Sequence, residues 1–489
     1  MITMRGASDN LTNRIAKIPM AMVLIPFALG IFFVDGYTLP LWLPILVCVV
    51  ALVGVILLRK WWQTLALFLL FCSAGALIHS TSFRGEIPYD QLLEMELEVE
   101  HSSVERSGYT SAEAQIVACE DSSLTDCKVA LWGDSLTHFK AGDRVHLITE
   151  VRPFRAEREQ YATLMHHRGF IGAVSVGYST LYEHTPTEDN TLHDWAVERL
   201  RGSMAEGDGR AVVLAMTTGE RGEIGDNLRQ NYSASGASHL LAVSGLHIGI
   251  AFILINLLLL PLILLPFGNL WRSVVAIALI WLYVWLCGMS PSAVRAAIMF
   301  SLLQISLSSL REYVSINILA GTAFVMLAVD SHILFDISFQ LSFIAVAGII
   351  LWAMPMYRRC TTRFKVVNIL LGILFVGIAS TLATMPLVAN SFGTLSLVGI
   401  LINPVVILLA NIVILAGILT LAFPFMGGVA EWAAEWQNSI VEWAASLPHG
   451  HFDVTIPEWV MWVIYTLYAV ATILFWSTPK EKKEPKIEG

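Results

Sequence analysis

Long apolar runs dominate this sequence, and they limit the fold more than any other feature. The first three lie at about residues 18–34, 39–58 and 61–79, and each is long enough to cross about 30 Å of hydrocarbon as a helix. Charged residues make up only 14% of the chain, against about 25% in an average soluble domain. We therefore expect a polytopic α-helical membrane protein with about ten or eleven spans.

The positions of basic residues predict how the spans are oriented. Arg5, Arg14 and Lys17 precede the first apolar run, and Arg59-Lys60 separates the second run from the third. By the positive-inside rule both regions are cytoplasmic, so the polar insertion that follows the third span is extracytoplasmic. The side of the C-terminus stays open, because the expected number of spans and the lysine-rich tail point to opposite sides.

The chain is expected to have five parts. These are a transmembrane hairpin with a third span at 1–84, the polar insertion at 85–180, amphipathic interfacial helices at 181–237, a second transmembrane region at 238–425, and an amphipathic helix with the final span and a charged tail at 426–489. The net charge of −9 excludes a protein that is basic throughout, so any binding to nucleic acid must depend on a local patch.

Alternating apolar and polar residues predict short β-strands in the polar insertion. They are Met95–Val99, Ala114–Ala118, Lys128–Trp132 and Val145–Val151. Their spacing predicts a small all-β domain that resembles an OB-fold, a barrel that elsewhere binds oligonucleotides. Cys119 and Cys127 bracket an expected turn, where they are candidates for a disulfide, with two free thiols as the alternative.

One basic stretch follows these strands. It contains Arg152, Arg155, Arg158 and Arg168, with aromatic residues between them. Cations for phosphates and rings for base stacking are what a single-strand binding groove needs. The alternative is a solvated charged linker, because glutamates are interspersed with the arginines.

The second transmembrane region opens with two histidines and a serine at the entrance of an apolar run over about 238–265. With Ser238 as N-cap, His239, Ser244 and His247 fall on one side of a single helix. Gly245 and Gly249 lie on the other side, as a small-residue ridge that lets another helix approach closely. Polar groups at membrane depth are costly, so we expect the first side to face a water-filled pathway.

Three further segments place polar groups in apolar surroundings. Arg295 lies one turn after a helix start at Ser290-Pro291, where it either binds an anion or snorkels to the headgroups. Asp336 and Gln340 share a helical face, for which the alternative role is interhelical hydrogen bonding. Asn403 precedes a proline within an apolar run and predicts a discontinuous helix, with a kinked helix as the alternative.

Four stretches together carry a resemblance to a known family. They are the sequence SHLLAVSGLH ending at His247, the pattern GxxPSAxRA around Arg295, the sequence DISFQLSF starting at Asp336, and the proline of Thr384-Met-Pro386 with Asn403-Pro404. In order and spacing they resemble the ComEC/Rec-type competence proteins, the inner-membrane channels for DNA uptake in transformation. In that family an OB-like domain lies between the early spans and the channel region, where the polar insertion lies here.

The resemblance implies a channel that passes single-stranded DNA through a lipid bilayer, the cytoplasmic (inner) membrane. His239, Ser244, His247, Arg295, Asp336, Gln340 and Asn403 would line the pathway. Longer members carry a metallo-β-lactamase-like domain after the last span. We expect this chain to have no nuclease, no catalytic residues, no metal and no cofactor. A periplasmic DNA receptor, a cytoplasmic helicase-like motor and a separate nuclease are then the expected partners.

Two other functions remain open at this stage. An intramembrane hydrolase would use the two histidines with an acid as metal ligands or as acid and base. Two histidines eight residues apart on one helix lie about 12 Å apart, too far to share a metal. A small-solute transporter is the other alternative, although no inverted repeat is visible. The sequence His449-Gly-His-Phe-Asp453 resembles a metal-binding pattern, but it lacks the domain that would supply further ligands.

Overall fold

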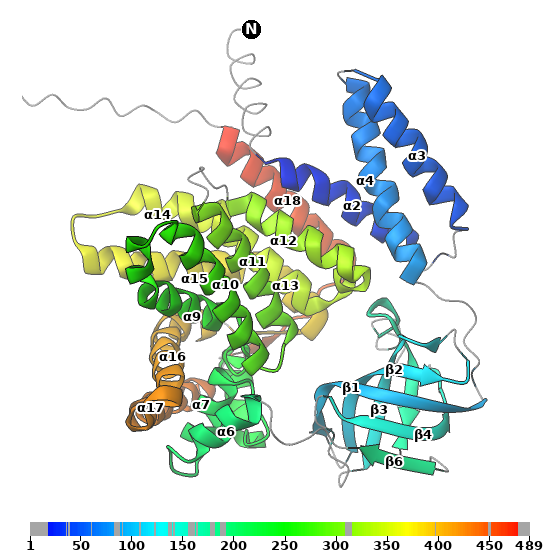
Figure 1. Ribbon diagram of the computed structural model, residues 1–489. Helices are drawn as coiled ribbons and strands as arrows, with labels where there is room; N and C mark the ends of the chain where they lie inside the picture. The colour runs from blue at the N-terminus through cyan, green and yellow to red at the C-terminus, as the bar shows by residue number, and fades with distance from the viewer. Residues whose placement is uncertain are drawn as a thin grey trace, which may run out of the picture. The chain divides into compact units, whose positions relative to one another are not determined.

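The computed structural model divides the chain into two compact units, each described by itself. The helical unit comprises residues 1–22, 196–322 and 341–489, and the barrel unit comprises residues 23–195 and 323–340. Figure 1 shows the elements of both units. The structure describes residues 18–35, 37, 40–59, 61–82, 89, 91–106, 109–121, 124–134, 139, 142–154, 162, 165–176, 181–185, 192–308, 315–396, 398–447 and 451–477.

Six strands form one sheet in the barrel unit, in the spatial order β5-β3-β2-β1-β4-β6. They are β1 (Leu92–Arg106), β2 (Tyr109–Cys119), β3 (Lys128–Asp134), β4 (Arg144–Glu150), β5 (Phe170–Ser175) and β6 (Leu181–Thr185). β3 and β5 are parallel, and the other neighbours are antiparallel. Arg152, just after β4, exchanges two backbone hydrogen bonds with Ala173 of β5, at 2.9 and 2.8 Å. The strands therefore close into the ring β1-β2-β3-β5-β4.

The period-two pattern of the strands explains the core of this barrel. Alternate apolar residues of β1 from Leu93 to Val99 point inward and are buried, whereas Glu94, Glu96, Glu98 and Glu100 lie on the outer face. The inward side chains of β1 are Leu93, Met95, Leu97 and Val99. All four predicted strands are confirmed, since each lies within or overlaps one of β1 to β4.

The two cysteines of the insertion do not lie opposite each other. Cys119 ends β2, and Cys127 precedes β3 and accepts a backbone hydrogen bond from Ile116 at 2.9 Å. The register of this hairpin places Cys127 beside Ile116 rather than beside Cys119, and the structure holds both cysteines as thiols. Burial raises the pKa of the Cys119 thiol. The disulfide therefore stays a prediction that this register does not favour.

The first three predicted spans form helices α2 (Pro19–Val34), α3 (Trp42–Leu57) and α4 (Trp61–Ser82). Glycines allow α2 and α4 to approach closely. A Cβ atom on Gly30 of α2 would lie 1.8 Å from the Cys72 carbonyl oxygen, and one on Gly75 of α4 would lie 2.1 Å from the Phe27 carbonyl oxygen. Both neighbours are backbone atoms, so neither position tolerates a side chain without moving a helix.

The rest of the chain is mainly helical. Its elements are α6 (Leu192–Arg201), α7 (Asp208–Thr217), α8 (Asp226–Ala234), η4 (Ser238–Leu240), α9 (Gly245–Leu258), η5 (Leu260–Leu264), α10 (Gly268–Leu286), α11 (Pro291–Ser308), α12 (Ser315–Val329), η6 (Ser331–Phe335), α13 (Ile337–Gly348), η7 (Ile349–Ala353), α14 (Met354–Cys360), α15 (Lys365–Phe392), β7 (Thr394–Ser396), α16 (Val398–Ala422), η8 (Pro424–Met426), α17 (Gly427–Ala445), β8 (His451–Asp453) and α18 (Glu458–Ser477).

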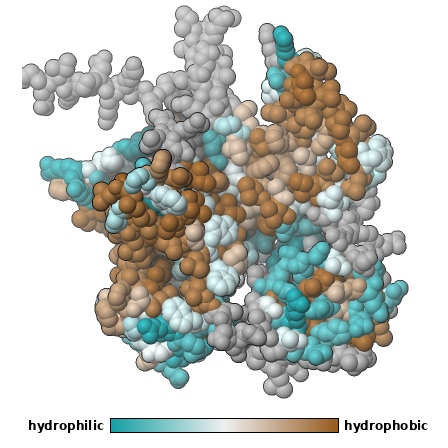
Figure 2. Space-filling view, viewed as in Figure 1, coloured by the Kyte–Doolittle hydropathy of each residue, from teal (hydrophilic) through white to brown (hydrophobic). Residues whose placement is uncertain are grey.

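Six helices among the described residues are long and apolar enough to span a membrane, and five further apolar helices are shorter. The long ones are Trp61–Thr81, Gly268–Leu286, Ile337–Cys360, Lys365–Phe392, Ile402–Ala422 and Glu458–Phe475. This is the composition of a polytopic helical membrane protein. Figure 2 shows hydrophobic side chains over α3 and α4 and mostly hydrophilic ones over the barrel, as contact with lipid and with water requires.

Two predictions about the helices are wrong. Within the range 181–237, where amphipathic interfacial helices were expected, α7 is instead buried among α8, α16 and α17. A Cβ atom on Gly417 of α16 would lie 2.2 Å from Thr217 Oγ1, so this glycine allows the close packing. The second error concerns Asn403-Pro404, because α16 continues through Pro404 and the chain breaks earlier, at Gly393 and β7.

Replacing Gly30 with alanine is expected to separate α2 from α4, because the new methyl group meets a backbone oxygen that cannot give way. The apparent unfolding temperature of the purified protein should fall. Gly377→Ala is the matched control, since nothing lies within 4 Å of its Cβ position and alanine favours a helix by about 1 kcal/mol over glycine. Equal unfolding temperatures for Gly30→Ala and the wild type would contradict the close approach.

Candidate functional site

The first helix of the predicted site begins later than the sequence suggested. Ser238–Leu240 forms a single 3-10 turn, and α9 starts at Gly245 with Ser244 as N-cap. Ser244 Oγ accepts a hydrogen bond from the Leu246 N–H at 3.3 Å, and the Ser244 N–H donates to His247 Nδ1 at 3.0 Å. The continuous helix over 238–265 capped by Ser238 is therefore wrong. The later serine caps the helix because His247 completes a reciprocal capping box.

This break separates the two histidines of the motif. His239 lies in η4 and is exposed, whereas His247 lies in the first turn of α9 and is fully buried. Their predicted common helical face does not exist, but Ser244 Oγ does lie 2.8 Å from His247 Nδ1. Since Nδ1 accepts the Ser244 N–H, a neutral His247 carries its proton on Nε2. That buried Nε2 has no hydrogen-bond partner among the residues that the structure describes.

Helix α11 starts beside α9, which brings the second motif to the first. It begins at Pro291, as predicted, and Ser292 Oγ donates a hydrogen bond to the Val243 carbonyl. Arg295, one turn inside α11, is only 4% exposed. An arginine that snorkels to headgroups keeps its guanidinium in water, so this burial favours an internal role for Arg295.

Small residues allow α9 and α11 to pack closely, as the glycine ridge predicted. A Cβ atom on Gly245 would lie 3.9 Å from Ala296 Cβ, and one on Gly249 would lie 3.2 Å from the Phe300 ring. The contacts advance in the same direction along both helices. The two helices are therefore parallel, and their first turns lie together.

Two further segments lie close to the helix pair α9 and α11. Gly219, in the left-handed region with φ of 87°, has its Cβ position 3.1 Å from the Cys287 carbonyl oxygen and 3.4 Å from Val243. Asn403 lies on α16, where its neighbour Ile402 belongs to the same buried cluster as Leu240 and Leu241. The Asn403 Oδ1 atom has no hydrogen-bond partner within the described part of the chain.

Asp336 and Gln340 belong to the barrel unit instead. Asp336 caps α13, since its Oδ1 accepts hydrogen bonds from the Ser338 N–H at 2.6 Å and the Phe339 N–H at 3.4 Å. Gln340 Nε2 donates to the Leu334 carbonyl at 2.9 Å. Gln340 therefore has a local structural contact, and the pathway role of both residues stays a prediction.

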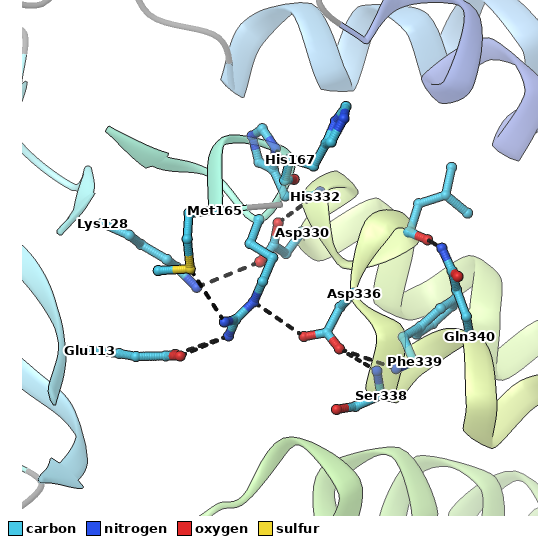
Figure 3. A network of polar contacts seen from close by, with 12 residues as sticks. Glu113, Lys128, Met165, His167, Asp330, His332, Asp336, Ser338, Phe339 and Gln340 are labelled. Atoms are coloured by element: carbon cyan, nitrogen blue, oxygen red, sulfur yellow. Dashed lines mark hydrogen bonds and ion pairs between the residues drawn. The ribbon is translucent and has the colours of Figure 1, made fainter. Parts of the chain in front are cut away.

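A polar network in the barrel unit surrounds the connection between α12 and α13 (Figure 3). Lys128 Nζ lies 3.7 Å from Asp330 and 3.5 Å from Glu100. Arg168 lies 2.9 Å from Glu113 and 3.5 Å from Asp336 Oδ2. Two cations of the barrel thus bind two aspartates of the connection.

Histidines hold the same connection from another side. His79 Nδ1 lies 2.9 Å from Ser331 Oγ, and His332 Nδ1 lies 3.2 Å from the His167 carbonyl oxygen. The ring of Phe335 stacks on that of His167, with 4.9 Å between centroids. Asp35, just after α2, joins the two helix ends to the barrel, because its carboxylate lies 2.6 Å from His167 Nδ1 and 3.3 Å from His79 Nε2.

Asp35 and His167 shift each other's pKa. Burial raises the pKa of the Asp35 carboxyl, but hydrogen bonds with His167 and His79 outweigh burial and hold it below its usual range. The hydrogen bond with Asp35 raises the pKa of His167 against the opposing effect of burial. The two groups therefore form an ion pair at mildly acidic pH.

Of the four arginines predicted to bind DNA, the structure describes two, and both pair with carboxylates. Arg152 Nε donates to Glu150 at 2.6 Å, and Arg168 binds Glu113 and Asp336. Arg155 and Arg158 lie outside the described residues. No group of three or more His, Cys, Asp or Glu side chains suited to hold a metal ion occurs in the described part of the chain.

Comparison with known proteins decides the family. The competence protein profile matches residues 216–479, which is more than half of the chain. The chain belongs to the competence protein family. Its match includes the Gly219 loop, α9 and α11, and this confirms the resemblance inferred from the motifs.

Two relatives of this competence protein show how far the similarity extends. An uncharacterized protein of Aquifex aeolicus strain VF5 is 28% identical over 257 residues, 52% of this chain and 57% of that protein. ComE operon protein 3 of Bacillus subtilis strain 168 is 29% identical over 216 residues, 44% of this chain and 26% of that protein. The chain thus matches little more than half of one relative and about a quarter of the other. No solved structure matches it.

Replacing Ser244 with alanine is expected to lower the stability of this competence protein by about 1 kcal/mol, because the first turn of α9 loses its cap. Ser244→Asp is the matched variant, since aspartate caps a helix as well as serine does. Hydrogen exchange of the Leu246 amide should rise in the alanine variant only. Unchanged exchange in Ser244→Ala would contradict the capping role.

The Asp35–His167 pair predicts a pH dependence of stability. The pKa of His167 is raised on folding, so its contribution is complete below the ordinary pKa of 6.5 and is lost as pH rises through the raised value. The pKa of Asp35 is lowered, so its contribution is complete above the ordinary pKa of 3.8 and is lost as pH falls through the lowered value. Together they stabilise the fold most between about pH 4 and pH 6.5.

His167→Gln should therefore lower the apparent unfolding temperature by about 2 °C near pH 6 and by less near pH 8.5. His146→Gln is the control, because His146 pairs with Glu94 on the barrel, away from Asp35. An equal loss at both pH values in His167→Gln would show that stacking on Phe335, rather than the ion pair, is what the variant removes.

Proposed function

We propose that this competence protein passes single-stranded DNA across the cytoplasmic membrane during uptake. The single observation that carries the proposal is the family match over residues 216–479, in which the two motif helices α9 and α11 start side by side. A polyanion that crosses a bilayer needs donors and cations along its path. The donor Nε2 of a neutral His247 lies on the first turn of α9, and the buried Arg295 lies one turn inside α11.

The barrel supports the same proposal, because it is a small closed β-barrel with the ring order β1-β2-β3-β5-β4, and OB-fold barrels elsewhere bind oligonucleotides. In this interpretation the barrel receives the strand outside the membrane. The outer face of β1 carries Glu94, Glu96 and Glu98, which repel phosphates. The strand would therefore contact the cations Lys128 and Arg168 rather than that face.

The remaining partners follow from the chemistry of the task. A DNA receptor would deliver DNA to the outer side, a separate nuclease would remove one strand, and a helicase-like motor would pull the other strand into the cytoplasm. A hydrolase is less well supported, because His239 is on a separate turn and the Ser244–His247 contact already serves the helix cap.

The test is uptake of labelled DNA into the cytoplasm of cells that carry variants at equal membrane level. Arg295→Gln should reduce internalised DNA about tenfold or more, as expected for one lost charge-assisted contact of about 1.5–3 kcal/mol, whereas Arg295→Lys should retain part of it. His247→Gln should also reduce uptake, although glutamine can replace histidine in the capping box and keep the fold.

Arg363→Gln is the control for this series, because Arg363 lies in the exposed loop between α14 and α15. Its uptake should equal that of the wild type. Normal uptake with Arg295→Gln would reduce Arg295 to a packing residue. Normal uptake after deletion of the whole protein would refute the proposed function.

A further inference from the structure

The connection between α12 and α13, residues 330–336, binds the barrel through two aspartates that each perform two tasks. Asp330 Oδ1 accepts a hydrogen bond from the His332 N–H at 3.0 Å, and Asp330 also lies 3.7 Å from Lys128 through Oδ2. Asp336 Oδ1 caps α13, and its Oδ2 lies 3.5 Å from Arg168 (Figure 3). In both cases one oxygen supports the local turn and the other binds a cation of the barrel.

The two cations are placed alike. Each binds one glutamate of the barrel and one aspartate of the connection, and each remains partly accessible, with 32% of the Lys128 side chain and 27% of the Arg168 side chain exposed. Lys128 begins β3 and Arg168 precedes β5, which are neighbouring parallel strands with Lys128 opposite Phe170. The cations therefore lie at the same end of adjacent strands.

A carboxylate and a phosphodiester compete for such groups. Guanidinium binds both through the same fork of donors, and ammonium binds both as a point charge. Partly exposed ion pairs contribute only about 0–1 kcal/mol each, so an arriving polyanion can replace the carboxylates. Phe154 packs on the buried side chains of Met165 and Phe170 and forms a T-shaped ring pair with the exposed His166, with 5.5 Å between centroids, so an aromatic ring that bases can stack on lies close to Arg168.

We propose that Lys128 and Arg168 bind phosphates of single-stranded DNA, and that Asp330 and Asp336 occupy these cations until a strand arrives. A bound strand displaces both carboxylates and frees the connection that leads into α13. Loading of the barrel is thereby coupled to the first turn of a helix of the competence region. The inference rests on the proposed function, since it assumes that the barrel receives the strand.

The test measures binding of a fluorescent oligothymidylate to the full-length protein in detergent. Asp330→Asn and Asp336→Asn each keep a side-chain oxygen for the local turn but remove the charge, so the fold should persist. Each is expected to tighten binding about two- to fivefold, the range that corresponds to a partly exposed ion pair. Arg168→Gln should weaken binding and lower the salt dependence of log K by about 0.7, the value for one lost phosphate contact.

Glu96→Gln is the matched control, because Glu96 pairs with Arg144 at 3.2 Å on the barrel and does not touch the connection. A similar gain in Glu96→Gln and Asp336→Asn would show a general charge effect and overturn the proposal. The gain from Asp336→Asn should also vanish when Arg168 is glutamine.

Hydrogen exchange separates this inference from the proposed function. The amides of residues 331–335 should exchange faster when the oligonucleotide is bound. Binding of the strand with unchanged affinity in both asparagine variants, or with unchanged exchange, would overturn the displacement but leave the DNA-binding barrel. Absence of binding by the wild type and by both asparagine variants would refute the role of the barrel as the strand receiver, and with it the displacement.

Discussion

Backbone groups at helix ends need partners, and in a protein embedded in lipid no water replaces a missing one. Short polar side chains at the start of helices meet this requirement here. Ser244 caps α9 with the help of His247, and Asp336 caps α13. The carbonyl of Val243, just before α9, is bound by the Ser292 hydroxyl of α11. The positions of the caps therefore decide where helices begin, and the helix starts decide which motif residues meet.

Local sequence patterns predict part of this fold, and the choice between two possible helix caps limits the rest. Alternation of apolar residues and the lengths of the apolar runs are local patterns, so they predict β1 to β4 and the first three spans, but not β5 or β6, which lies in the range expected to be helical. The start of α9 was not, because Ser238 and Ser244 are both capable caps before apolar residues. Histidine in place of the usual glutamate or glutamine at the third position conceals the capping box. The reciprocal bond of His247 and the hydrogen bond from Ser292 of α11 to the Val243 carbonyl favour the second serine.

The network around residues 330–336 had no counterpart in the sequence patterns. The network joins residues that lie far apart along the chain, namely Asp35, His79, Lys128 and Arg168. In the sequence, none of them shows a pattern that points to the others. Their meeting depends on closure of the barrel, which places the residues before β5 beside the start of β3. Long-range pairing of this kind has no periodicity. The sequence therefore identified Arg168 and Asp336 separately, but not as partners.

The parallel start of α9 and α11 has an electrostatic consequence. Each helix carries about half a positive elementary charge at its N-terminus, so two adjacent starts together present roughly one. This charge belongs to the backbone and is the same at every pH. It also cannot be removed by replacing a single side chain. An anion that reaches Gly245 and Pro291 therefore experiences an attraction that persists whatever the protonation state of His247.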